Sequence, residues 1–377
     1  MEELKELIGL ITKHKIKRIE IIGGPDFHNS KLQKLYEGIR TGSLSTDEEA
    51  ILAIYADDQK GDFNYIKLKS RLQERLINTV FFIDINKSNH NEIQRAYYSC
   101  HKDWAAVKIL IGKGARLSAI PISEKILKKA EKFEFNQLAL DITRSLRFHY
   151  SAIDKDRKKY AKYNNSVKTH QKILMAELLA DEYHSTLISR SSTSNASKAE
   201  ISKLAIQYSN KLKEETKNLN SYRLNLFART VYAYRYQIVN DYKNVIRECE
   251  EAIAFFESKT YQASKVAIFN FLFKILACHI QLKEFKKGEE IAKKCLQDMP
   301  EGTPNWFYTY ELYITLCLHT RRFQEAYEVY LKVSENKNFN RLYTKSTESW
   351  KVYEAYLNYF ISNGEIKVDQ EKPLEKF

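Results

Sequence analysis

The sequence predicts an all-α protein in which helical hairpins stack on one another. Three stretches near the C-terminal end share one pattern, and each begins with an aromatic residue after a short polar turn, namely Tyr242, Phe285 and Phe323. These residues lie 43 and 38 positions apart (285 minus 242; 323 minus 285). A period in that range is typical of helix pairs that bury their apolar faces only against neighbouring pairs. The chain also holds only 11 Gly and 5 Pro, which favours helices joined by short turns.

The bulk composition narrows the class of protein. A chain of 377 residues is too long for one compact core, so we expect several domains or an open array. The acidic, amphipathic start Met1–Ile8 is not a signal peptide, and no segment approaches the ~18 consecutive apolar residues of a membrane span. The five cysteines are odd in number and lack Cys-x-x-Cys spacing. We interpret them as reduced core residues of a cytoplasmic protein.

Residues 1–90 do not show the repeat and are predicted to form a small N-terminal helical cap domain. Helices are expected at about 2–13, 30–41, 47–57 and 63–84, and a β-branched stretch at 16–22 could form a short strand. Thr46 and Glu49 have the spacing of a capping box, in which two side chains satisfy free amides at a helix start.

The helix pair 47–57 and 63–84 superficially resembles a helix-turn-helix. Basic residues stand near the start of its second helix, where a recognition helix would carry them: Lys67, Lys69, Arg71 and Arg75. Residues 1–90 hold 14 basic and 14 acidic side chains, and this neutral balance argues against nucleic-acid binding by the segment.

From about residue 91 onward the pattern is helix, short turn, helix. The array is predicted to span 91–361, with hairpins at roughly 92–132, 135–168, 170–218, 221–258, 263–298 and 304–336 and a capping helix at 341–361. The Ser-rich stretch 190–197 is interpreted as a mobile loop that ends in a second capping box, Ser197 to Glu200. The charged tail 362–377 has no periodic pattern, so we expect it to be flexible.

The best-preserved hairpin runs from Leu272 to Pro300. Its marked positions are Leu272, Ile275, Leu276 and His279 in the first helix, then Phe285, Gly288, Ala292, Cys295 and Pro300. An aromatic at the turn, small residues where the helices cross and a closing proline resemble the tetratricopeptide repeat, a helix-turn-helix unit of 34 residues. The resemblance implies a right-handed α-solenoid. This chain departs from the family in its longer period and in the large Tyr residues at small-residue positions.

In tetratricopeptide arrays the first helix of each hairpin lines the concave face, where family members commonly hold an extended peptide or a helix. Carried over by position, the resemblance implies a concave face made of Phe227, Thr230, Tyr234, Gln237, Asn270, Phe273, Ala277, Gln281, Tyr308, Glu311, Thr315 and His319. Members that grip a chaperone's C-terminal carboxylate need Lys and Asn where Phe273 and Ala277 stand, so we do not expect that ligand. The leading hypothesis is a non-enzymatic scaffold or adaptor that binds a partner protein here. A peptide-sensing regulator is an alternative.

Two aromatic runs, Tyr232–Tyr236 and Trp306–Tyr310, are the strongest local signals. Each run wraps around its helix, so only part of it can be core. Tyrosine suits a recognition surface because its ring buries apolar area while its hydroxyl stays hydrogen-bonded. The competing interpretation is that these rings fill gaps between irregular repeats.

The net charge of +13 is concentrated in the middle of the chain, where 15 Lys or Arg face 6 Asp or Glu between Lys113 and Lys172. Aromatic residues interleave with the basic cluster, whose members are Lys125, Lys128, Lys129, Arg144, Arg147, Arg157, Lys158, Lys159 and Lys162. Such a surface suits a nucleic-acid backbone or another acidic partner, although charge runs on helices are usually a solvated face. A nucleic-acid-binding regulator that uses the 113–172 surface is therefore the runner-up.

Motifs for catalysis or metal binding are weak. A helix from 170 to 189 places His170, Glu177, Asp181 and His184 in one narrow sector, as a metal site would need. Apolar residues occupy its opposite side, so we expect this sector to face water and hold no metal. The glycines at 23–24 and 112–114 lack the context of a phosphate cradle, and no Gly-x-Ser-x-Gly or His-Glu-x-x-His is present. We therefore predict no enzymatic activity and no cofactor.

Overall fold

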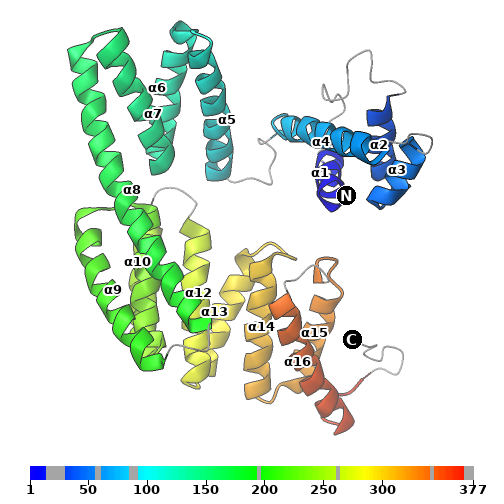
Figure 1. Cartoon of the computed structure of the whole chain (residues 1–377). Coiled ribbons are helices and arrows are strands. Elements are labelled where there is room, and N and C mark those ends of the chain that lie inside the picture. Colours follow the sequence, from blue (N-terminus) through cyan, green and yellow to red (C-terminus); the bar gives the residue numbers. More distant parts are fainter. Residues whose placement is uncertain are drawn as a thin grey trace. The chain divides into compact units, whose positions relative to one another are not determined.

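The computed structural model describes residues 1–13, 30–55, 61–84, 92–192, 197–259, 264–339 and 344–368 (Figure 1). Within these ranges every regular element is a helix and none is a strand, which confirms the all-α prediction. The short strand considered at 16–22 and the middle of the loop expected at 190–197 lie outside the described residues. The second capping box is present at the start of α9, between Ser197 and Glu200.

The chain divides into two compact units, Met1–Ile126 and Leu127–Phe377. The boundary falls inside helix α6 (Arg116–Lys132). The boundary expected from the sequence lies at residue 90, before helix α5 (Glu92–Gly112). In the structure α5 therefore belongs to the first unit.

Four helices of the first unit pack around one apolar core. They are α1 (Glu2–Lys13), α2 (Lys31–Thr41), α3 (Asp47–Tyr55) and α4 (Gly61–Val80). Leu4, Leu35 and Leu72 lie at the centre, each with at most 1% of its surface exposed. The predicted capping box at the start of α3 is confirmed, because Thr46 and Glu49 each accept a hydrogen bond from the other's main-chain N–H at 3.2 Å.

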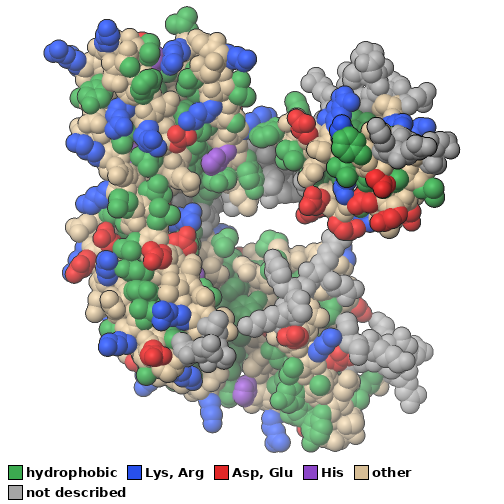
Figure 2. Space-filling view, in the orientation of Figure 1, with side chains coloured by type: hydrophobic (Ala, Val, Ile, Leu, Met, Phe, Trp, Pro, Cys, Tyr) green, Lys and Arg blue, Asp and Glu red, His purple; other side chains and the backbone are tan. Residues whose placement is uncertain are grey.

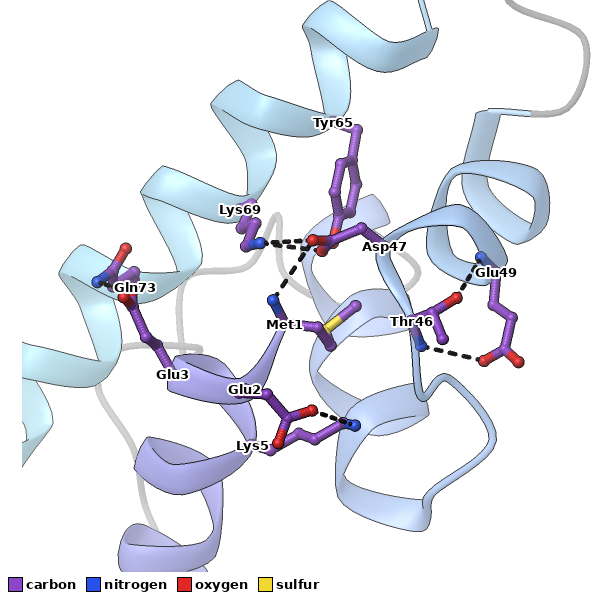
Figure 3. Close-up of polar contacts among 10 residues, drawn as sticks. All are labelled: Met1, Glu2, Glu3, Lys5, Thr46, Asp47, Glu49, Tyr65, Lys69 and Gln73. Atoms are coloured by element: carbon purple, nitrogen blue, oxygen red, sulfur yellow. Dashed lines mark hydrogen bonds and ion pairs between the residues drawn. The ribbon is translucent and has the colours of Figure 1, made fainter.

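Asp47 joins three helices of this unit (Figure 3). Its carboxylate accepts hydrogen bonds from Tyr65 and Lys69 of α4 and pairs with the amino group of Met1 at 3.4 Å. Burial acts to raise the pKa of the Asp47 carboxyl, but the hydrogen bonds from Tyr65 and Lys69 and the charge of Lys69 lower it to about 2. An ionised Asp47 thus ties the start of α3 to α1 and α4.

The second unit is a succession of helices that pack in chain order. After α6 these are α7 (Asn136–Phe148), a short π-helix (His149–Ile153), α8 (Arg157–Ser192), α9 (Lys198–Asn218), α10 (Tyr222–Gln237), α11 (Tyr242–Glu257), α12 (Ser264–Gln281), α13 (Phe285–Asp298), α14 (Pro304–His319), α15 (Phe323–Ser334) and α16 (Thr344–Ser362). From α10 to α16 each helix packs against the next, and α14 also contacts α12 and α16. After α16, Ile366 is buried and Lys367 hydrogen-bonds to Gln324 of α15.

Helix α8 runs without a break for 36 residues, so the predicted division between hairpins at 168–170 is wrong. The helix contains no Gly or Pro, and nothing in it interrupts the main-chain hydrogen bonds. Near its start Tyr163 stacks on Tyr150, which precedes α8. Further along, Ala180 and Leu187 join the core of α9 and α10. One long helix therefore belongs to two successive packing groups.

One tight turn recurs between paired helices. Asn240, Lys283 and Arg321 adopt a left-handed main-chain conformation, with φ between 58° and 60°. The next residue in each turn donates its N–H to the carbonyl five positions earlier at 2.9–3.0 Å, which satisfies a free carbonyl at the end of the first helix. The aromatic residue of the sequence repeat then begins the second helix. Glu134, with a φ of 55°, makes the same turn between α6 and α7.

The aromatic residues of the last two turns each contact the helix that follows their own pair. Phe285 stacks on His319 at the end of α14, and Phe323 stacks on Phe360 near the end of α16, with ring centroids 5.8 and 3.8 Å apart. The compact residue three positions later is buried in each repeat. All five cysteines lie in the described ranges, where they are buried and form no disulfide bond. The sequence repeat thus corresponds to one packing arrangement.

Gly288 marks the closest approach between helices. A Cβ atom at this position would lie 3.1 Å from Leu316 Cδ1 and 3.3 Å from Leu276 Cδ1. We expect Gly288→Leu to lower the free energy of unfolding of the second unit by about 2 kcal/mol, because the added atoms overpack the crossing of α12, α13 and α14. Urea unfolding followed by circular dichroism measures this. Lys286→Leu places the same side chain on the exposed face of α13 and should change stability by less than about 0.5 kcal/mol; equal losses in the two variants would contradict the prediction.

Candidate functional site

A pocket of about 700 Å³ lies along the first helices of successive pairs in the second unit, and we call it the groove. Its walls come from α10, α12 and α14, with His184 of α8 and residues near the α10–α11 turn. The structure brings together eight residues of the predicted concave face: Phe227, Thr230, Gln237, Asn270, Phe273, Ala277, Gln281 and Tyr308. Pockets of this volume commonly bind ligands.

Four residues of the predicted face do not line the groove, and three of them contact neighbouring helices instead. The hydroxyl of Tyr234 hydrogen-bonds to the end of α8. Glu311 is buried, and the Thr315 hydroxyl donates to its carbonyl at 2.9 Å and pairs with Tyr353 of α16. His319 stacks on the ring that begins α13. Partner binding by these four residues stays a prediction.

The aromatic runs are mostly core. Tyr232, Trp306 and Tyr310 have 4–7% of their surface exposed. Tyr234 and Tyr236 are half-buried, and Tyr308, which is 43% exposed, lines the groove. Its ring meets Phe273 edge to face, with centroids 5.2 Å apart, which is a favourable geometry for an aromatic pair. Phe273 itself is buried, so Tyr308 supplies the exposed aromatic surface on this side of the groove.

Side-chain amides dominate the polar part of the groove. Five of its sixteen lining residues are Asn or Gln, namely Gln237, Asn240, Asn270, Gln281 and Asn305. Within the described part of the chain, the amides of Gln237, Asn270, Gln281 and Asn305 have no hydrogen-bond partner. Each amide offers both a donor and an acceptor. The groove can therefore hydrogen-bond to groups of either kind.

Two charged or titratable residues of the groove were missed by the sequence reasoning. Lys274 lies next to Phe273 on α12, and His184 comes from α8, outside the assigned hairpins of the concave face. Burial, helped by the charge of Lys274, lowers the pKa of His184, and its ring lies 5.3 Å from that of Phe227. The sequence could have indicated Lys274, because the residues of each first helix that line the groove span a wide arc of that helix. It could not have indicated His184, which reaches the groove only through the packing of α8.

The sector of His170, Glu177, Asp181 and His184 was expected to face water, and this expectation is wrong for His170 and Glu177. His170 and Glu177 are 7% and 4% exposed, because α7 and α10 cover this side of α8. Glu177 accepts hydrogen bonds from Asn136 Nδ2 at 2.7 Å and from the Ser221 hydroxyl. Asn136 Oδ1 also faces His170 Nδ1 at 3.4 Å. The sector is thus a buried polar junction between α7, α8 and α10.

The remaining members of that sector are separate. Asp181 pairs with Arg223 at 3.1 Å, and His184 lies in the groove. In the described ranges no three His, Cys, Asp or Glu side chains are grouped so that they could hold a metal ion. None of the described helices combines the length and apolar character needed to cross a bilayer.

The basic cluster is largely exposed (Figure 2). Its exposed members are Lys125, Lys128, Arg144, Arg157, Lys158, Lys159 and Lys162, whereas Lys129 and Arg147 are partly buried. Arg147 donates to Asn164 at 3.3 Å and Lys159 to the Tyr150 hydroxyl at 3.2 Å. Among the described residues, Arg144, Arg157, Lys158 and Lys162 form no ion pair. Positive charge at the start of α8 also opposes the helix dipole.

Two of the four basic residues predicted for a recognition helix, Lys67 and Lys69 of α4, make contacts within the first unit. Lys69 is committed to Asp47, with both carboxylate oxygens 2.9 Å away. Lys67 lies over the Phe63 ring. The preceding helix α3 begins with Asp47 and two glutamates, which would repel phosphate. The helix-turn-helix interpretation gains nothing from this geometry.

Comparison with other proteins yields no relative. No family model matches the chain, and the search of curated proteins found none with detectable similarity. The functional argument therefore depends on the residues of the groove and of the basic cluster.

Glu177 gives a pH-dependent test of the buried junction. Burial raises the pKa of its carboxyl, and the hydrogen bonds from Ser221 and Asn136 offset this only in part. The folded state therefore holds this proton more tightly than the unfolded chain, whose pKa is about 4.3, so Glu177 lowers stability as pH rises through its folded pKa. We expect Glu177→Gln, which keeps an acceptor oxygen, to gain stability relative to the native protein as pH is raised from about 4 to about 7.

Urea unfolding at several pH values measures the difference between the two proteins. The other titratable groups are present in both proteins, so their contributions cancel in the difference between the two free energies of unfolding. Glu177→Ala serves as the control, because it removes the same titration but leaves Asn136 and Ser221 without an acceptor, and it should be about 2 kcal/mol less stable than Glu177→Gln at every pH. A difference between native and Gln proteins that does not change with pH would contradict the assignment.

Proposed function

We propose that this chain is a non-enzymatic scaffold or adaptor that holds a peptide or helix of a partner protein in the groove. One observation carries the proposal: eight residues chosen only from the phase of the sequence repeat lie around a single pocket. Exposed aromatic side chains and amides without partners are features of recognition surfaces. The partner would be a protein met in the cytoplasm.

The packing order supports the same proposal. In the tetratricopeptide family, first helices stack on first helices, and here α14 contacts both α12 and α16. We infer a right-handed α-solenoid of tetratricopeptide-like hairpins from α10 to α15, closed by α16. In such an array the first helices form one continuous concave wall. The groove would be the deepest part of that wall.

Loss of groove side chains should release the partner. We expect the double variant Asn270→Ala with Tyr308→Ala to capture its main partner at least about tenfold less well, since exposed tyrosines at an interface centre often carry much of the affinity. Quantitative mass spectrometry of affinity-captured proteins measures this.

The matched control is Asn358→Ala with Tyr359→Ala on α16. Both residues are exposed and lie outside the groove. Only proteins retained by this control and lost by the groove variant count as partners of the groove. A partner set unchanged in the groove variant, with its fold intact by circular dichroism, would overturn the proposal.

A second candidate function is nucleic-acid binding by the basic cluster. The observation that favours it is the set of exposed cations on α7 and α8 that form no ion pair within the described residues. Phosphate contacts release counterions, so binding would weaken steeply with salt. Phe148 and Tyr160, which are 59% and 41% exposed, would be available for base stacking.

A gel-shift assay tests this candidate with duplex DNA and single-stranded RNA at about 50 and 200 mM salt. For this function we expect a shift at low salt that is lost at high salt and abolished by Arg157→Glu, Lys158→Glu and Lys162→Glu together. The control reverses three exposed lysines elsewhere, Lys265, Lys286 and Lys294, and should shift like the native protein. Absence of a shift at low salt would remove this candidate.

A further inference from the structure

The side-chain amides of the groove favour an extended peptide over a helix as the ligand. The main chain of an extended peptide presents unpaired N–H and C=O groups, whereas a helix satisfies its own. A helix would need a mainly apolar groove, but Gln237, Asn270, Gln281 and Asn305 line this one and have no partner within the described residues. These amides can pair with both groups of an extended main chain.

The charge of the groove indicates a second property of the ligand. Lys274 is the single Lys or Arg among the lining residues, and no Asp or Glu lines the groove. Lys274 is partly buried and forms no ion pair in the described part of the chain. A partly buried cation without a counterion is costly, and a ligand carboxylate would offset that cost.

The position of Lys274 shows where the carboxylate would lie. Asn270, Lys274 and Gln281 are spaced by four and seven residues, which places them on one face of α12. Lining residues of α10 lie on one side of α12, and Asn305 and Tyr308 of α14 lie on the other. Side-chain amides of the groove therefore lie on both sides of Lys274. A carboxylate at Lys274 would belong to a side chain within the segment, with main chain continuing on both sides.

We propose that the groove selects an extended peptide segment that carries an Asp or Glu side chain, which pairs with Lys274 while the amides hold the neighbouring main chain. This inference rests on the proposed function, because it names the ligand of the same groove. The exposed ring of Tyr308, which packs against the buried Phe273, would take an apolar side chain next to the acidic one. The segment would need no free C-terminal carboxylate.

The experiment uses the full-length chain and two phage-displayed libraries. The first is a random octapeptide flanked on both sides by fixed linker, too short to form a stable helix and without a free C-terminus. The second is a library of 20-residue amphipathic helices. Both are selected against the native protein, Lys274→Glu and the control Lys265→Glu, which reverses an exposed lysine of the same helix outside the groove.

We expect the native protein and the Lys265→Glu control to enrich octapeptides with Asp or Glu at one fixed position. Lys274→Glu should bind these peptides at least about tenfold more weakly, as for loss of one charge-assisted hydrogen bond, and should select Lys or Arg at that position. Enriched octapeptides without an acidic position, or with unchanged affinity for Lys274→Glu, would overturn the inference and leave the proposed function standing. Enrichment of helices alone would also overturn it. Failure of both libraries would overturn the proposed function as well.

Discussion

The short left-handed turn between paired helices is the constraint on which the rest of the second unit depends. A left-handed conformation at Asn240, Lys283 and Arg321 is unfavourable for residues other than glycine, by roughly 1 kcal/mol each. The hydrogen bond that follows each turn, and the burial of the aromatic residue that begins the next helix, offset this cost. Because the turn is so short, the second helix must fold back on the first, and the apolar face of each pair remains available to the next pair.

The groove follows from this arrangement. When pairs stack with a constant turn, equivalent residues of the first helices lie beside one another, and Phe227, Asn270 and Tyr308 therefore reach one pocket from α10, α12 and α14. The second helices supply small buried residues such as Gly288 and Ala326, which let the helices pack closely. Packing and the proposed recognition thus use different faces of the same hairpins. The long helix α8 joins this arrangement by adding His184 to the groove.

Sequence patterns predicted the structure where the contacts that determine it are local or repeat along the chain. The phase of Tyr242, Phe285 and Phe323, together with the tetratricopeptide resemblance, predicted the positions of the last helix pairs and eight of the sixteen residues that line the groove. The repeat phase did not predict that α8 is one continuous helix. The boundary at 168–170 was assumed from the repeat alone, although no Gly or Pro lies there to end a helix. The repeat phase also could not predict the burial of Glu177, whose partners Asn136 and Ser221 lie 41 and 44 residues away. Such distant polar contacts have no periodic signature.

The central claim is that a partner segment lies along the first helices, and hydrogen–deuterium exchange of the full chain with and without a captured partner tests it most directly. Main-chain amides become protected where binding suppresses local opening. The account predicts new protection in α10, α12 and α14, with little change in α11, α13 and α15. Protection confined to the second helices, or to α7 and the start of α8, would contradict it.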